Sequence, residues 1–153
     1  MSTSIQLSNN GTSPFEKLLG HNPAVLEKWN DLENTLFNHT SLDANLLEQV
    51  RRTLALENAC EYCMVKGGQP AFDVYVTRIS NATAFAELFA MDHTSIQPAH
   101  FSLLSEVFTE KEISELCTFI TFITASQKFG RIMNLTEDLQ ANSVTSLSEM
   151  RKI

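Results

Sequence analysis

The strongest constraint on the fold of this chain is the spacing of its apolar residues, which recur every three or four positions along most of the sequence. An α-helix places residues three and four apart on one face, so this spacing predicts amphipathic helices that bury one side. Such helices are expected at residues 22–37, 41–55, 81–91, 97–107 and 110–129. The five glycines and four prolines are too few for a sandwich of many short strands. The sequence therefore predicts an all-α domain, a single helical bundle of about six or seven helices.

Capping signals indicate where two of these helices begin. Asn22 followed by Pro23 is typical of an N-cap and the first helical residue. Thr109 followed three residues later by Glu112 forms a capping-box motif, the clearest helix start in the chain. The segment 73–79 contains strand-forming residues but no partner strand is evident, so we interpret it as helical.

The periodic region lies between two polar segments. Residues 1–20 lack periodicity and predict a loose polar lead-in. Residues 136–153 form a polar tail with a weak helical pattern of leucines. Residues 21–135 are long enough to form one helical domain around a single core.

Charge and hydropathy restrict the partners and the location. Acidic residues outnumber basic ones 18 to 11, and the basic residues are scattered, whereas nucleic-acid binding requires clustered Lys and Arg. The longest apolar stretch, residues 117–125, is far shorter than the roughly 20 residues that cross a bilayer. The N-terminus has neither the apolar core nor the basic start of a secretory signal. We therefore expect a cytoplasmic protein that binds neither nucleic acid nor membrane.

The most informative motif is a pair of cysteines, Cys60 and Cys63, whose spacing allows two sulfurs to meet on one helix face. Asn58 is expected to cap this short helix, which places Cys60 in a first turn where partial positive charge favours a thiolate. Gly67 and Gly68 are expected to end it. In a reducing compartment such a pair is typical of redox chemistry or metal binding. The alternative is a buried, unreactive pair.

Two further residue types bear on the chemistry of the pair. A zinc site would need a second Cys or His pair, and the four histidines are scattered, so we predict no metal and no cofactor. Glu48 is the candidate proton acceptor for a reactive thiol. On one unbroken helix it would lie roughly 18 Å from Cys60, so it reaches the sulfurs only if the chain folds back near residues 56–58. A solvated helix carboxylate is the alternative.

The pattern of Glu48, eleven residues and then Cys60-x-x-Cys63 resembles the signature of the carboxymuconolactone decarboxylase and alkylhydroperoxidase D superfamily. The signature is a Glu, eleven residues and CxxCxxxH. The segment 21–24 and the turn at Leu42 and Asp43 look like family openings, and the segment 108–113 with the apolar helix after it resembles the closing helix of the family. The resemblance covers roughly residues 20–135. It implies an alkylhydroperoxidase D-like helical fold that assembles into trimers or hexamers.

The resemblance also implies an activity and its residues. In the antioxidant branch the activity is peroxiredoxin-type reduction of hydroperoxides, reset by an external dithiol reductant protein. Carried over by position, Cys63 would attack the peroxide, Cys60 would resolve it by closing a disulfide, and Glu48 would accept the proton. Tyr62, between the cysteines, is a candidate relay group. The family histidine falls on Gly67, so this chain lacks one member of the relay.

Three functions therefore compete. The first is a thiol peroxidase that passes from thiolate through sulfenate to disulfide. The second is a redox-sensing or non-catalytic oligomer whose relay has decayed, which Gly67 favours. The third, suggested by the family name, is decarboxylation of a lactone acid, although no cationic cluster suited to such a substrate is evident. The resemblance and the apolar helix at 113–129 both predict a homo-oligomer, and Cys117 on that helix is expected to be unreactive.

Overall fold

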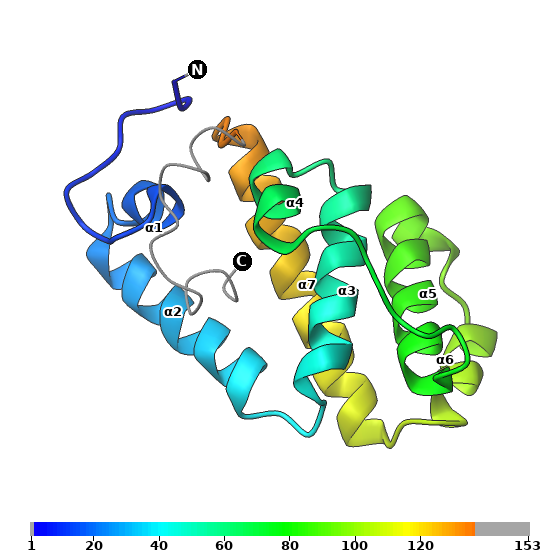
Figure 1. Cartoon of the computed structure of the whole chain (residues 1–153). Helices are drawn as coiled ribbons and strands as arrows, with labels where there is room; N and C mark the ends of the chain where they lie inside the picture. Colours follow the sequence, from blue (N-terminus) through cyan, green and yellow to red (C-terminus); the bar gives the residue numbers. More distant parts are fainter. Residues whose placement is uncertain (1, 137–153) are drawn as a thin grey trace.

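The computed structural model describes residues 2–136, and all regular secondary structure in that part of the chain is helical (Figure 1). The elements are α1 (Pro14–Leu19), α2 (Pro23–Asn38), α3 (Ala44–Glu57), α4 (Glu61–Gly67), α5 (Thr77–Asp92), the short 3-10 helix η1 (His93–Ser95), α6 (Pro98–Ser105) and α7 (Glu110–Ile132). The predicted fold class, an all-α bundle of six or seven helices, is confirmed. Over the same residues, no helix has the length and apolar character needed to cross a membrane.

Helices α3 and α7 form the centre of the bundle (Figure 1). They pack against each other, and α4 and α5 contact both of them. The apolar positions predicted on α3 are fully buried: Leu46, Leu47, Val50 and Leu54. Burying each of these side chains stabilises the fold by about 1.5–3 kcal/mol relative to exposure, so α3 is the main internal helix.

Helix α7 begins as the sequence predicts. The Thr109 hydroxyl accepts a hydrogen bond from the Glu112 N–H at 3.2 Å, and the Glu112 carboxylate accepts one from the Thr109 N–H at 3.0 Å. The helix then continues through Gly130 to Ile132. Arg78 of α5 joins that helix to the start of α7, because it donates hydrogen bonds to the Val107 carbonyl and to the Glu112 carboxylate, both at 2.6 Å.

The apolar circumference of α7 is covered by the chain itself. Phe119 is fully buried, the Phe122 ring lies 4.9 Å from the Trp29 ring, and the Phe129 ring lies 5.4 Å from the Phe15 ring. An apolar α7 is therefore explained by the core of one chain, and it no longer argues for an interface between subunits.

Two expectations from the sequence need correction. The segment predicted as a loose lead-in contains a helix, because Ser13 caps α1 and the apolar side chains of α1 are buried. Six residues are too few to reveal a helical period in the sequence. Of the predicted helical segment 73–79, residues 77–79 are the first turn of α5, but residues 73–76 are not helical. The Asp73 carboxylate accepts a hydrogen bond from the Tyr75 N–H at 2.9 Å and forms a turn that competes with helix. The predicted tail at 136–153 lies outside the described residues apart from Thr136.

The connection between α4 and α5 crosses over α3 (Figure 1). Two α3 side chains hold it there. The Gln49 carbonyl accepts from the Ala71 N–H at 2.8 Å, and Arg52 donates to the Gln69 carbonyl at 3.2 Å. These hydrogen bonds fix the end of α4 against the middle of α3.

Gln127 provides a test of how α7 is joined to α3. Its amide is fully buried, donates to the Arg51 backbone carbonyl at 3.2 Å and accepts from the Asn58 side chain at 2.9 Å. Gln127→Ala should lower the free energy of unfolding by about 1–3 kcal/mol, because it leaves a polar group without its partner. Chemical denaturation measures this. The exposed neighbour Lys128 is the control, and Lys128→Ala should stay within about 0.5 kcal/mol of wild type; equal losses in both variants would contradict the role of Gln127.

Candidate functional site: a buried cysteine pair beside a buried arginine

Cys60 and Cys63 lie at the start of α4 and are joined in a disulfide, with Cα atoms 5.2 Å apart. The prediction that the two sulfurs meet is confirmed. Cys60 is itself the N-cap of α4, and its sulfur accepts a hydrogen bond from the Cys63 N–H at 3.3 Å. Asn58, the expected cap, instead ends α3 by donating its N–H to the Leu54 carbonyl. Ala59 adopts a left-handed conformation with φ of 52°, which turns the chain back between the two helices.

The cysteine pair is sealed from solvent. Cys60 is 1% exposed, Cys63 is 0% exposed, and Tyr62 between them is equally buried. Helix α7 comes close to the sulfurs: a Cβ added at Gly130 would lie 3.4 Å from the Cys60 sulfur. In this state neither sulfur is open to a reagent in solution.

Glu48 lies on α3 and is bound by two arginines of the same helix. Arg51 donates to both carboxylate oxygens, from Nε at 3.0 Å and from Nη2 at 2.6 Å, and Arg52 donates a third hydrogen bond at 3.0 Å. Burial by itself favours the neutral carboxyl, but the hydrogen bonds and charges of Arg51 and Arg52 together outweigh it and lower the pKa of Glu48 below its ordinary value of 4.5. Glu48 is therefore a firmly held carboxylate.

Arg51 occupies the place where α4 has no side chain. It is fully buried, and a Cβ added at Gly67 would lie 2.7 Å from the Cζ atom of Arg51 and 2.8 Å from Nη1. These distances are shorter than real Cβ contacts, so a side chain at residue 67 would force the guanidinium to shift. Gly67 follows Cys63 by one helical turn, which puts Arg51 on the face of α4 that carries the second cysteine.

Sequence reasoning missed Arg51. The available signal was an Arg three residues after a Glu on a predicted helix, a spacing that favours an ion pair. Most pairs with this spacing lie on the surface, so the spacing alone does not predict a guanidinium in the interior. The glycine that accommodates it lies on a different helix.

Three other side chains that could carry chemistry, His93, His100 and Cys117, lie on η1, α6 and α7. His93 is exposed on η1, and His100 accepts from the Gln97 N–H at 2.8 Å and so caps α6. Cys117 is half-buried on α7, and desolvation raises the pKa of its thiol, as expected for an unreactive cysteine. Among residues 2–136, no three His, Cys, Asp or Glu side chains are grouped in a way that could hold a metal.

The fold and the site together define an all-helical protein with a buried CxxC disulfide. No family model and no curated protein sequence matches the chain. Among solved structures, it is similar to an uncharacterized peroxidase-related protein from Silicibacter sp. TM1040, with a TM-score of 0.70 and 17% sequence identity. The match covers 79% of this chain and 74% of that one. At this identity the likeness establishes that the two chains share a helical fold.

The lowered pKa of Glu48 predicts a dependence of stability on pH. Its contribution is present above the ordinary glutamate value of 4.5 and is lost as the pH falls through the lower pKa of the folded state. Glu48→Gln should lower the free energy of unfolding by about 1–3 kcal/mol at neutral pH, because it leaves a buried arginine without its counter-charge. The difference from wild type should shrink as the pH falls below 4.5.

Denaturation over a series of pH values measures this difference. Glu57→Gln, at an exposed position at the end of the same helix, is the control and should change stability by less than about 0.5 kcal/mol. A Glu48→Gln deficit that stays constant down to acid pH would show that the carboxylate charge does not stabilise the fold.

Proposed function

We propose that this protein is a thiol-dependent hydroperoxide reductase that uses Cys60 and Cys63 as its dithiol and disulfide. The observation that carries the proposal is the disulfide itself, which joins two cysteines at a helix start in the interior of the bundle. The similarity of the fold to a peroxidase-related protein supports it. The resemblance of the Glu48 and CxxC spacing to a peroxide-reducing family assigns the roles.

The proposed cycle begins with the reduced pair. The Cys63 thiolate attacks one peroxide oxygen, so that an S–O bond forms, the O–O bond breaks and the departing oxygen takes a proton to leave as water or an alcohol. Cys60 then attacks the Cys63 sulfenic acid, the disulfide closes and water leaves. An external dithiol protein returns two electrons and two protons by thiol–disulfide exchange. Since the Cα atoms are 5.2 Å apart, closure needs little backbone movement.

The proton of the attacking thiol needs an acceptor. Glu48 and Tyr62 remain our candidates for this role. A carboxylate that accepts three arginine N–H groups and has a lowered pKa is a weak base, so its proton-accepting role is expected to be slow. This weakness, together with Gly67 at the position of the family histidine, predicts modest turnover.

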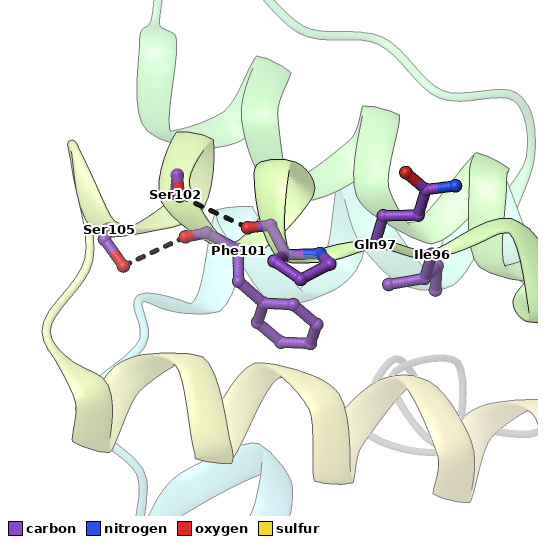
Figure 2. A pocket seen from close by; sticks show the side chains of 6 residues that line it. Ile96, Gln97, Phe101, Ser102 and Ser105 are labelled. Atoms are coloured by element: carbon purple, nitrogen blue, oxygen red, sulfur yellow. Dashed lines mark hydrogen bonds between the residues drawn. The ribbon is translucent and has the colours of Figure 1, made fainter.

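A redox sensor is the second candidate. The complete burial of both sulfurs favours it, because a sensor needs to react only once and not to turn over rapidly. The lactone-acid decarboxylase receives no such support. The hollow on α6 shown in Figure 2 is lined by Ile96, Gln97, Pro98, Phe101, Ser102 and Ser105. It contains no Lys or Arg to bind an acidic substrate.

A peroxidase assay with a small-molecule dithiol as the reductant tests the proposal. Wild type should consume hydrogen peroxide slowly, at a rate that rises with pH as Cys63 ionises. Cys63→Ser should reduce the rate to background, and mass spectrometry of peroxide-treated wild type should show the loss of two hydrogens on the peptide spanning both cysteines. Cys117→Ser is the control and should keep the wild-type rate. Two free thiols that persist under peroxide would rule the function out.

We also propose that the chain forms a homo-oligomer, a trimer or hexamer as the resemblance implies. Because α7 is covered within the chain, the interface needs other apolar surface. Exposed large side chains are available at Val74 and Tyr75 before α5 and at Met91 near its end. Light scattering should give a mass several times 17.1 kDa. A monomer at micromolar concentration would contradict the assembly and leave the peroxidase proposal intact.

A further inference from the structure

The side chain of Arg51 is a buried cation with an unused donor. Nε and Nη2 bind Glu48, but Nη1 has no hydrogen-bond partner among the described residues, although it is shielded from solvent. A buried N–H without an acceptor destabilises a fold by about 1–3 kcal/mol, and more when the group is charged. Nη1 is therefore a buried donor that is available to an acceptor on a neighbouring side chain.

The position of the guanidinium points to a neighbouring side chain on α4. Nη2, Cζ and Nη1 of Arg51 all lie close to the place of a Cβ on Gly67, with Cζ at 2.7 Å and Nη1 at 2.8 Å. Cβ atoms one helical turn apart are about 5–6 Å apart, so the Cys63 side chain is the next one along that face of α4. In the disulfide the Cys63 sulfur is neutral and bonded to Cys60. After reduction it can carry a negative charge beside a cation in a low-dielectric interior, where the attraction is stronger than in water.

We propose that Arg51 stabilises the Cys63 thiolate when the disulfide is reduced. Glu48 holds the guanidinium in position, and Gly67 leaves the space that the guanidinium occupies. The electrostatic effect of Arg51 on Cys63 is argued from the geometry alone. Its relevance to catalysis rests on the function proposed above. This arrangement gives Glu48 a second role as the anchor that fixes the guanidinium. Arg51 is a positioning residue that acts through its charge on the attacking sulfur, and no proton passes through it.

The charged and titratable groups near α4 lie on three helices. On α3 they are Glu48, Arg51, Arg52 and the exposed Glu57. On α4 they are the exposed Glu61, Lys66 and the buried Tyr62. On α7, Lys128 and Arg131 are exposed, and Gly130, which lies beside the Cys60 sulfur, is uncharged. Among the cations in this set whose burial is described, Arg51 is the only one that is fully buried. Removing it should therefore affect Cys63 more than removing any of the exposed charges, which water and salt screen.

The test measures the ionisation of Cys63 directly. In a Cys60→Ser, Cys117→Ser background, Cys63 is the only thiol. The ultraviolet absorbance of its thiolate is measured as a function of pH. A variant that also carries Cys63→Ser serves as the blank. Arg51→Met should raise the pKa of Cys63 by about one unit or more, which lowers the thiolate fraction about tenfold at neutral pH. Arg51→Lys, which keeps the charge without the forked geometry, should recover part of the shift. Lys128→Gln removes one exposed positive charge from α7 and should leave the titration unchanged.

Gly67→Ala provides an independent arm that changes no charge. Its Cβ would overlap the guanidinium and displace Arg51, so the Cys63 titration should move in the same direction as in Arg51→Met. Circular dichroism checks that each variant is folded. If Arg51→Met does not fold, the Cys63 titration in Gly67→Ala tests the proposal. A Cys63 titration that is unchanged in a folded Arg51→Met or Gly67→Ala variant would overturn the proposal. Because the readout involves no peroxide, a wild type that titrates as expected but shows no turnover would refute the proposed function and leave this inference standing.

Discussion

The arrangement around the cysteine pair depends on one ion pair, between the buried Arg51 and the partly buried Glu48. The carboxylate holds the guanidinium with two hydrogen bonds, and the guanidinium lies against α4 where Gly67 has no side chain. Removing Glu48 would leave the buried charge of Arg51 without its counter-charge, which is far less favourable than an intact pair. Helix α4, which carries both sulfurs, packs against α3 with this ion pair on one side and against α7 on the other.

The same ion pair changes how the missing histidine is understood. From the sequence, Gly67 looks like the loss of a relay residue, because the family pattern has a histidine there. In the structure that space is occupied by the guanidinium of Arg51, which would have to shift to make room for a side chain at residue 67. A guanidinium does not give up its proton at physiological pH, so Arg51 cannot replace a histidine in proton transfer. In the role that we propose for it, Arg51 acts on the Cys63 sulfur through its charge alone.

Burial of the disulfide adds a second constraint. Both sulfurs are buried, and Gly130 of α7 lies beside the Cys60 sulfur. The left-handed Ala59 and the Asn58 amide bound to Gln127 hold the turn that leads into α4. In this arrangement the disulfide is shielded from solvent on the side of α7 as well as on the side of α3.

The sequence by itself determined the features that arise from interactions between near neighbours. Helical spacing of apolar residues located α3 and α7, and local caps located the starts of α2 and α7, because these signals act within one or two turns. The CxxC spacing predicted a sulfur pair for the same reason. Only the tertiary structure decided that Ala59 turns the chain, that α1 joins the core and that Arg51 is buried against Gly67. Those outcomes depend on which surfaces meet across the bundle, and residues distant in the chain carry no local signal of that contact.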